Sequence, residues 1–315
     1  MSGRPLVIQT EHLDEVCAAW LAERCELVRC PSDDEPRFSE LLSRAEGLVI
    51  RTYTKVDAAM LSRAPRLRVV GRAGVGVDNI DVAACAARGV VVASTPAANT
   101  RAVVEYVAAL MFDAIRPRVF LEGAVDVGRW KEIRAGVIAP RQAAGATLGI
   151  LGLGKIGSQV ARVGSALDMR VLYHDLVDIP PEGRFGAEPV SFDELLSSAD
   201  VLTVHVDGRE GNRGLLGAAA FARMKSDVVL INTSRGFVVD PAACAAFMRA
   251  NPGARAMLDV HEPEPFGADY PLLGLPNVRL SPHIAAATAP AHRNMSWVVR
   301  DVWRVLSGGS EGVRH

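Results

Sequence analysis

The chain has 315 residues, of which 49% are hydrophobic and 23% charged, with 28 glycines and 18 prolines. These proportions exclude a disordered or fibrous chain, and at roughly 150 residues per domain they favour two domains. Lys+Arg 35 against Asp+Glu 36 gives a formal net charge of -1. No overall field therefore draws the chain to nucleic acid or to an anionic membrane, and neither is predicted as a partner.

The cysteines and the start of the chain predict a cytoplasmic location. The 5 cysteines are odd in number and form no C-x-x-C pair, which favours small core residues in a reducing compartment over disulfides or a metal site. The first residues lack the basic-then-apolar layout of a signal peptide, and no apolar run reaches the roughly 18 residues of a membrane span.

Short β-branched runs alternate with helical patterns along the whole chain, which is typical of buried parallel strands joined by crossover helices. The first series of predicted strands is Leu6–Ile8, Leu27–Val28, Leu48–Ile50, Leu67–Val70 and Val90–Ala93. The second series is Thr147–Leu151, Arg170–Tyr173, Val201–Val206, Val228–Ile231, Ala256–Val260 and Val278–Leu280. Both halves are therefore predicted to be doubly wound α/β units.

Four helical patterns lie between or after these strands. Asp57–Ser62 and Asp81–Arg88 fit between strands of the first series, and Thr100–Arg116 is predicted as one long apolar helix. A further helical pattern from Met295 to Leu306 follows the last strand and needs an apolar surface to cover. That surface fits either unit, so the pattern alone leaves open whether the chain returns to the first unit.

A glycine-rich turn follows the first strand of the second series. Gly152, Gly154 and Gly157 form G-x-G-x-x-G directly before an amphipathic segment. The first glycine permits the tight turn, the second admits a pyrophosphate against the backbone, and the third lets helix and strand pack closely. The next strand ends at Asp175, 175 − 157 = 18 residues on. Such a carboxylate accepts from ribose hydroxyls and repels a 2′-phosphate, so the predicted cofactor is NAD rather than NADP.

Three polar segments follow later strands of the same unit, at the edge where open α/β sheets bind ligands. They contain Arg235, then Asp259 with Glu264, and finally His283. A guanidinium fork binds a carboxylate bidentately, and an imidazole held by a carboxylate exchanges a proton with a hydroxyl group. Taken singly, each residue is more often a surface charge or a packed side chain. Together beside a nucleotide motif they predict hydride transfer to and from a 2-hydroxy acid.

The chain resembles the D-isomer-specific 2-hydroxyacid dehydrogenase family over essentially its full length. The matching segments are GRAGVGVDNID (71–81), NTRAVVEY (99–106), GLGKIG (152–157), NTSRG (232–236), DVHEPEP (259–265) and SPHIAAAT (281–288). The resemblance implies two Rossmann-like domains, with an NAD-binding domain (96–285) inserted into a substrate domain (1–95 and 286–315). It also implies a homodimer built around the inserted domain.

The resemblance also implies residue roles. Arg235 binds the substrate, His283 is the acid/base, and Glu264 is its hydrogen-bond partner. Backbone N–H groups of Gly74, Val75 and Gly76 meet the substrate carboxylate. The implied cofactor contacts are Gly152, Gly154, Lys155, Ile156, Gly157, Asp175, Val206, Thr233, Ser234 and Asp259. The chain departs from the family at Tyr106, where histidine is usual.

The substrate is predicted from two further arginines. Arg51 and Arg72 end the third and fourth strands of the first series, and the resemblance to the phosphoglycerate dehydrogenase branch implies that they hold a phosphate. Pairing with Asp57 or Asp78 is the simpler alternative for them. The predicted reaction interconverts 3-phosphoglycerate and phosphohydroxypyruvate. Hydroxypyruvate or glyoxylate reduction is the close alternative, and an NAD-sensing corepressor of the C-terminal-binding-protein type is a distant one.

Overall fold

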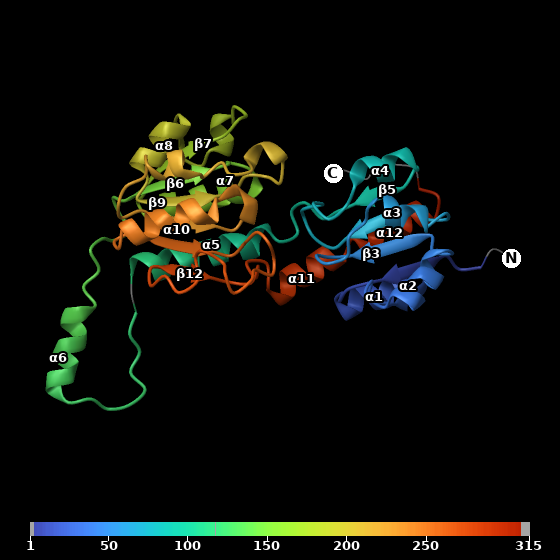
Figure 1. The fold of residues 1–315 in the computed structure, drawn as a ribbon, viewed down its shortest axis with the longest axis horizontal. Helices are drawn as coiled ribbons and strands as arrows, with labels where there is room; N and C mark the ends of the chain where they lie inside the picture. The colour runs from blue at the N-terminus through green and yellow to red at the C-terminus, as the bar shows by residue number, and fades with distance from the viewer. Residues whose placement is uncertain (1–2, 117, 310–315) are drawn as a thin grey trace. The chain divides into compact units, whose positions relative to one another are not determined.

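The computed structural model describes residues 3–116 and 118–309, which form two compact units. Unit 1 comprises residues 1–99 and 286–315, and unit 2 comprises residues 100–285. The chain thus leaves unit 1 once and returns to it, as Figure 1 shows by colour. The sequence predicts domain boundaries between residues 95 and 96 and between residues 285 and 286. No helix of the described residues is long and apolar enough to cross a membrane.

Unit 1 is built on a parallel sheet of five strands in the order β2-β1-β3-β4-β5. The strands are β1 (Leu6–Gln9), β2 (Glu26–Arg29), β3 (Gly47–Ile50), β4 (Val69–Arg72) and β5 (Val91–Ala93). The helices are α1 (Glu15–Ala22), α2 (Glu35–Leu42), α3 (Ala58–Ser62), α4 (Val82–Ala87), α11 (Ala289–Ser296) and α12 (Val299–Leu306). β1 and β3 are buried along their whole length, as a sheet covered on both faces requires.

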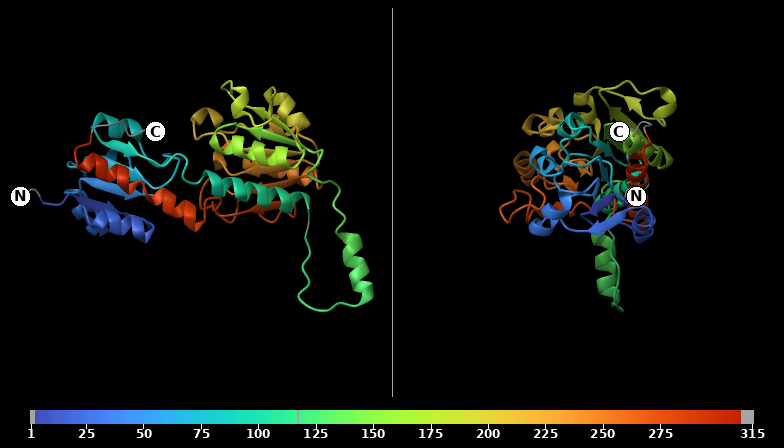
Figure 2. Two further views of the ribbon diagram at one scale, coloured as in Figure 1. Left: turned by 180° about the vertical axis from the view of Figure 1, so that it is seen from behind. Right: turned by 90° about the vertical axis from the view of Figure 1, so that its right-hand side faces the viewer.

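The C-terminal helical pattern covers the sheet of unit 1, which answers the question that its sequence left open. It forms two helices rather than one, with Trp297 and Val298 between α11 and α12. Val299, Val302 and Leu306 of α12 are buried against the sheet, and Figure 2 shows this helix lying along it. A Cβ on Gly71 of β4 would overlap Val302, so this glycine allows the helix its close approach.

Unit 2 is built on a parallel sheet of seven strands in the order β12-β11-β10-β9-β6-β7-β8. The strands are β6 (Thr147–Leu151), β7 (Arg170–His174), β8 (Glu188–Pro189), β9 (Val201–Val204), β10 (Val229–Asn232), β11 (Arg255–Leu258) and β12 (Val278–Leu280). The helices are α5 (Thr100–Ile115), α6 (Val127–Gly136), α7 (Lys155–Ala166), α8 (Phe192–Ser198), α9 (Ala218–Phe221) and α10 (Pro241–Ala250). The two-residue strand β8 was not predicted.

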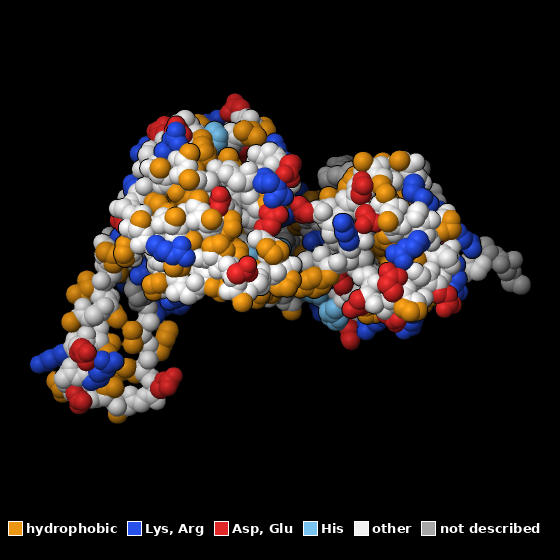
Figure 3. Space-filling model, viewed as in Figure 1, with side chains coloured by type: hydrophobic (Ala, Val, Ile, Leu, Met, Phe, Trp, Pro, Cys, Tyr) orange, Lys and Arg blue, Asp and Glu red, His pale blue; other side chains and the backbone are white. Residues whose placement is uncertain are grey.

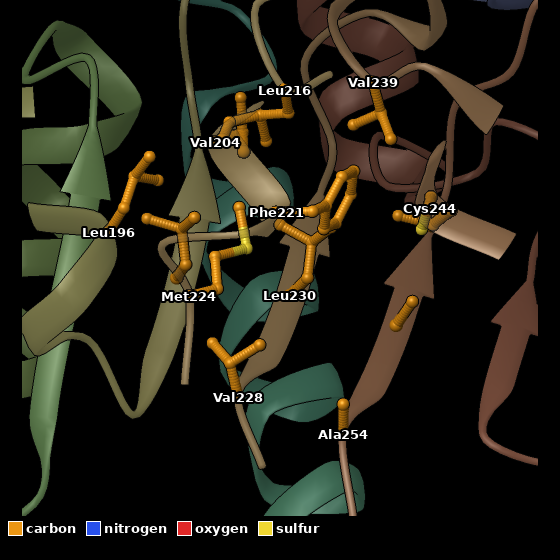
Figure 4. Close-up of a cluster of buried hydrophobic side chains, with 14 of the residues drawn as sticks. Leu196, Val204, Leu216, Phe221, Met224, Val228, Leu230, Val239, Cys244 and Ala254 are labelled. Carbon is orange, nitrogen blue, oxygen red and sulfur yellow. The ribbon is translucent and has the colours of Figure 1, made fainter. Parts of the chain in front are cut away.

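The strand order of unit 2 reverses at β6, which lies between β9 and β7. Crevices at such switch points, outside the carboxyl ends of the strands, are where doubly wound sheets bind ligands. A buried cluster that includes Val204, Phe221 and Leu230 packs under α9 and α10 (Figure 4). The packed sheet of unit 2 carries the loops that follow β6, β9, β10 and β11.

One part of unit 2 buries nothing against its own unit. No residue of α6 is buried, and Figure 1 shows the helix at the end of a long excursion from the sheet. The segment 118–138, here called the arm, carries large apolar side chains that are exposed. They are Val119, Phe120, Leu121, Val125, Val127, Trp130 and Ile138.

Candidate active site

The glycine-rich turn joins β6 to α7. Gly152 has φ 92°, and a Cβ there would lie 2.9 Å from the backbone of His205. A Cβ on Gly157 would overlap the carbonyl oxygen of Gly152, whereas a Cβ on Gly154 would meet nothing within 4 Å. The first and third glycines are therefore required by the packing of the turn itself. The second borders open space at the start of α7, where the first N–H groups of a helix lack intrahelical acceptors.

Asp175 lies directly beside this turn, at the end of β7. Its Oδ2 accepts a hydrogen bond from the backbone N–H of Leu153 at 2.7 Å, and its Oδ1 accepts from Val177 at 3.0 Å. The 18-residue spacing expected from the sequence therefore brings the carboxylate to the glycine loop.

The loop after β9 borders the same turn. The strand ends at Val204, so Val206 lies in the loop rather than in the predicted strand. Burial lowers the pKa of His205 to about 3, which keeps its imidazole neutral. The same loop carries Arg209, a cation that was not predicted from the sequence as a site residue. Its pKa is raised mainly by the hydrogen bonds that it donates to Asp207, and the charge of Asp175 contributes as well. Asp207 accepts from its Nε and Nη2 at 2.7 and 2.6 Å.

The residues after β10 form a tight turn around one amide side chain. Asn232 Oδ1 accepts from the N–H and the hydroxyl of Ser234 at 3.0 and 2.8 Å, and its Nδ2 donates to the carbonyl of Arg235 at 2.9 Å. A Cβ on Gly236 would overlap the backbone of His261, so only glycine fits after Arg235. The guanidinium of Arg235 donates to the carbonyl of Ser234 at 2.8 Å, and its charge helps to lower the pKa of Asp207.

Asp259, at the end of β11, is fully buried and organises the segment that carries His283. Its Oδ1 accepts from the hydroxyl of Ser281 at 2.6 Å and the N–H of Ile284 at 2.9 Å, and its Oδ2 accepts from the N–H of Ala285 at 2.8 Å. Both oxygens are therefore committed to the chain itself. The predicted contact of Asp259 with the cofactor stays a prediction, whereas its role in shaping residues 281–285 is directly visible.

His283 and Glu264 form a hydrogen-bonded pair. His283 Nδ1 lies 2.8 Å from Glu264 Oε2, and Glu264 Oε1 accepts from the backbone N–H of His261 at 2.7 Å. Burial acts to raise the pKa of Glu264, but these two hydrogen bonds outweigh it and hold the pKa below its ordinary range. Glu264 is therefore a carboxylate at neutral pH. It fixes the ring through Nδ1 and leaves Nε2 as the nitrogen available for proton exchange.

The backbone at His283 is strained. Its φ of 56° lies in the left-handed region, which costs a residue with a Cβ about 1–2 kcal/mol. Two hydrogen bonds from its N–H hold the conformation, to the carbonyls of Asp259 at 2.8 Å and Ser281 at 3.0 Å. Strain of this kind clusters at functional sites, and here it coincides with a histidine that a carboxylate orients.

Two further side chains belong to the network around His283. The hydroxyl of Tyr106, on α5, donates to Ser281 Oγ at 2.9 Å, which in turn bonds Asp259. Tyr106, at a position where the family usually has histidine, is therefore part of the hydrogen-bond network around His283. His261 is buried, packs edge-on against Phe266 at 4.8 Å and bonds the carbonyl of Ser281. Its role is packing.

The predicted substrate residues of the first series belong to unit 1. Arg51 follows β3, and its Nη1 donates to the carbonyl of His12 at 3.4 Å. Arg72 ends β4 and folds over Gly74, since a Cβ on that glycine would overlap its guanidinium. No described residue accepts a hydrogen bond from the N–H groups of Val75 or Gly76. Neither Asp57 nor Asp78 is seen to pair with Arg51 among the described residues.

The residues of unit 2 fit a dinucleotide. The turn is open only where the second glycine would meet a pyrophosphate, and Asp175 lies beside it. Thr233 Oγ1 is buried and bonds no described residue. Buried hydroxyl groups are normally hydrogen-bonded, so a bound molecule is expected to supply the partner here. No described cluster of three or more His, Cys, Asp or Glu side chains could hold a metal ion. Fold and site together define an NAD-binding oxidoreductase of the doubly wound α/β class.

Comparison with known proteins gives the family. Residues 108–285 match the model of the D-isomer specific 2-hydroxyacid dehydrogenase NAD binding domain. The chain is 42% identical over 257 residues to the D-3-phosphoglycerate dehydrogenase of Archaeoglobus fulgidus, covering 81% of this chain and 48% of that protein. It is 35% identical over 306 residues to the glyoxylate reductase of Aeropyrum pernix, covering 95% of this chain and 91% of that protein.

A solved structure agrees with these relatives. The D-lactate dehydrogenase of Aquifex aeolicus, solved with NAD and lactic acid, superposes with a TM-score of 0.81 at 26% identity, covering 96% of both chains. The chain belongs to the D-isomer-specific 2-hydroxyacid dehydrogenase family, whose members are oxidoreductases that act on CH–OH donors. It spans about half the length of the A. fulgidus relative.

Proposed function

We propose that the protein interconverts a D-2-hydroxy acid and its 2-oxo acid with NAD, and that its substrate is 3-phosphoglycerate/phosphohydroxypyruvate. The observation that carries the reaction is the His283–Glu264 pair on a strained, anchored segment, in the same unit as the nucleotide turn and Arg235. Steady-state turnover of 2-oxo acids with NADH would separate this function from that of a corepressor that only senses NAD. Among relatives of known name, both phosphoglycerate dehydrogenase and glyoxylate reductase occur.

Each polar residue of unit 2 has a distinct task in this reaction. The guanidinium of Arg235 binds the substrate carboxylate and polarises the reacting carbonyl. In the oxidative direction His283 Nε2 takes the hydroxyl proton, and in the reductive direction it returns that proton to the carbonyl oxygen. The carboxylate of Glu264 stabilises the imidazolium. When bound, NAD accepts or supplies the hydride of the substrate carbon, so electrons and protons balance without another reactant.

The cofactor tasks follow the order of the strands. Gly152, Gly154, Lys155, Ile156 and Gly157 would hold the pyrophosphate at the start of α7, and Asp175 would accept from the adenosine ribose. The remaining cofactor residues lie after later strands. They are Val206, Thr233 and Ser234, with Asp259 acting through the segment that it anchors.

The substrate proposal rests on unit 1. A plain 2-hydroxy acid needs one cationic anchor, which Arg235 supplies. Arg51 and Arg72 at neighbouring strand ends would bind a second anionic group, and the N–H groups of Gly74, Val75 and Gly76 would meet the carboxylate. Burial lowers the pKa of Arg51, and a guanidinium desolvated in this way gains from a bound anion.

The test compares phosphohydroxypyruvate with hydroxypyruvate as substrates for NADH oxidation. We expect a higher kcat/KM for the phosphorylated acid, and Arg51→Ala and Arg72→Ala should lower that value more than the value for hydroxypyruvate. His283→Asn should lower turnover of both about 10²–10⁴-fold with NADH binding little changed. A wild-type preference for hydroxypyruvate or glyoxylate would favour the reductase alternative. Equal losses of both substrates in the arginine variants would remove them from this role.

We also propose a homodimer in the cytoplasm. The arm carries seven large apolar residues that its own chain leaves exposed, with Phe120 79% and Ile138 81% accessible. Exposed apolar patches of this extent mark interaction surfaces, and a second copy of the chain offers the same arm in a two-fold arrangement. The cytoplasmic location is supported by five cysteines that are all unpaired and buried.

A further inference from the structure

Two histidines stack on each other in unit 1. His12 follows β1 and His292 lies on α11, with ring centroids 5.1 Å apart and an interplanar angle of 23°. His12 is exposed and His292 half-buried, and Figure 3 shows histidine side chains at the surface of this unit. No ring nitrogen of the pair hydrogen-bonds any described residue. The pair therefore presents unoccupied hydrogen-bonding groups rather than a closed internal network.

Arg51 adds a third basic group to this pair. Its guanidinium reaches the carbonyl of His12, and its charge acts on His292. Within residues 3–116 and 118–309, no ion pair joins Arg51 to a carboxylate. Burial is the main cause that lowers the pKa of Arg51, and the charge of Glu11 opposes it. A half-buried guanidinium held only by one long hydrogen bond to a carbonyl is poorly compensated.

The two nearby carboxylates are already used by the backbone and by another arginine. Glu11 accepts from the N–H groups of residues 51–54 at 2.8–3.1 Å. Asp14 accepts from the N–H of Val16 at 3.1 Å and from Arg293 Nε at 3.0 Å. Both carboxylates thus fix the loop after β3 and the start of α1. Neither hydrogen-bonds His12 or His292.

The electrostatics of His292 show that the other two basic groups act on it. Its pKa is lowered, first by burial and then by the charges of Arg51 and His12, with Asp14 acting in the opposite direction. Like charges crowded together disfavour protonation, and a bound anion reverses that effect. A bound anion would therefore oppose the effect that Arg51 and His12 have on His292.

We infer that His12, His292 and Arg51 form the subsite for a tetrahedral oxyanion of the substrate, a phosphate or a sulfonate. This inference rests on the proposed function and extends it, because it assigns two residues to the second anionic group that neither the sequence motifs nor the family resemblance pointed to. Two of its three basic groups are imidazoles, so we expect anion binding at this subsite to depend on pH.

The sharpest test uses sulfopyruvate beside hydroxypyruvate, because a sulfonate does not titrate between pH 5 and 9 whereas a phosphate does. In the wild type the ratio of kcat/KM, sulfopyruvate over hydroxypyruvate, should fall as the pH rises and the imidazoles lose their protons. His12→Asn and His292→Asn should each lower the ratio at low pH by about tenfold, as expected for losing one charge-assisted hydrogen bond. The double variant should show no pH dependence of the ratio.

Arg37→Ala is the matched control, since Arg37 is an exposed arginine on α2 of the same unit. It should leave the ratio and its pH dependence unchanged. Phosphohydroxypyruvate, measured at one pH, distinguishes phosphate from sulfonate as the preferred oxyanion. Equal losses of sulfopyruvate and hydroxypyruvate in the histidine variants would indicate a packing role and overturn the inference, as would a ratio independent of pH in the wild type.

A binding measurement separates failure of this inference from failure of the proposed function. If no 2-oxo acid is reduced, the proposed function fails, and the subsite is tested with sulfate alone by NMR of the histidine rings. Sulfate should raise the titration midpoints of His12 and His292, identified through the single variants. Unchanged midpoints at millimolar sulfate would overturn the inference.

Discussion

In the proposed reaction, the proton chemistry depends on the carboxylate of Glu264. Its lowered pKa means that it stays ionised down to a pH below its ordinary value of about 4.5. Its negative charge is therefore present over the whole working range, and in the proposed reaction this charge would stabilise the imidazolium. Asp259 lies only five residues earlier in the same motif, but its contacts differ. Both of its carboxylate oxygens accept hydrogen bonds from backbone N–H groups.

The first prediction concerns Glu264→Gln. Reduction of the 2-oxo acid needs a protonated imidazole, so activity falls as the pH rises. Without the carboxylate the imidazolium is less stable, and the fall should begin about 1 pH unit lower than in the wild type. The measurement is kcat/KM for the 2-oxo acid from pH 5.5 to 9.5. A profile that coincides with that of the wild type would remove Glu264 from this role.

Asp175 carries the second prediction, a preference for NADH. Its position beside Leu153 places a negative charge at the nucleotide turn, which favours ribose hydroxyls and repels a 2′-phosphate. The charge of Asp175 also acts on Arg209, but the guanidinium of Arg209 is bound bidentately by Asp207. NADH should therefore exceed NADPH in kcat/KM by about 10–100-fold.

The matched variant is the double substitution Asp175→Asn with Leu176→Arg. The amide oxygen can still accept the N–H of Leu153, while the added arginine offers a partner to the phosphate. This variant should shift the preference toward NADPH. Comparable kcat/KM for the two cofactors in the wild type would refute the assignment.

Several residues of the site could be predicted from the sequence because they belong to compact motifs at strand ends. The glycine turn, Asp175 and the Glu264–His283 pair lie where such motifs place them. Tyr106 and Ser281 could not be found in this way, because their contact joins segments 175 residues apart. The His12–His292 stack likewise forms only when α11 returns to the first sheet.

At the scale of elements, the segment 281–285 shows how one buried carboxylate shapes a functional loop. Three donors converge on Asp259, and the N–H of His283 bonds its carbonyl. The strained φ of His283 is sustained by these contacts. If His283 acts as proposed, a substitution at Asp259 should therefore change both stability and catalysis.

Asp259→Asn is the third prediction. An amide has one acceptor oxygen, so its NH₂ group would face a backbone N–H, which leaves a buried donor unsatisfied. We expect a loss of about 1–3 kcal/mol in the free energy of unfolding and at least a tenfold lower kcat. Denaturant unfolding and steady-state kinetics measure the two.

Ser281→Ala is the matched control for this loop, since it removes one donor and keeps both backbone bonds to Asp259. Its losses should be smaller in both measurements. If Asp259→Asn matched the wild type in stability and kcat, the anchoring role would be wrong.

The strands and most helices were predictable because β-branched runs and helical periodicity are local signals. Three elements were not, and one of them, the strand β8 (Glu188–Pro189), has only two residues. The C-terminal pattern looked continuous, yet it breaks at Trp297 and Val298 so that α12 can lie against Gly47 and Gly71. The apolar residues of the arm helix α6 show little helical periodicity, and none of its residues is buried on its own chain.

At the scale of the whole molecule, the arm supports the fourth prediction. The wild type should sediment as a dimer at micromolar concentration, and Phe120→Asp combined with Ile138→Asp should yield monomers, because a buried charge opposes an apolar interface. Val16→Asp is the control, since Val16 is 56% exposed on α1 of unit 1, and it should leave the dimer intact. A monomeric wild type would contradict the proposal.

The most direct measurement follows a labelled hydride. The protein is incubated with [4,4-²H₂]NADH and each of phosphohydroxypyruvate, hydroxypyruvate and glyoxylate, and the products are analysed by mass spectrometry and chiral chromatography. We predict one deuterium at C2 of the product, D configuration where C2 is a stereocentre, fastest formation from phosphohydroxypyruvate, and a rate lowered about 10²–10⁴-fold in His283→Asn. NADH that is not consumed, a product of L configuration, or a product without deuterium would contradict the assignment of this chain as an NAD-dependent D-2-hydroxyacid dehydrogenase.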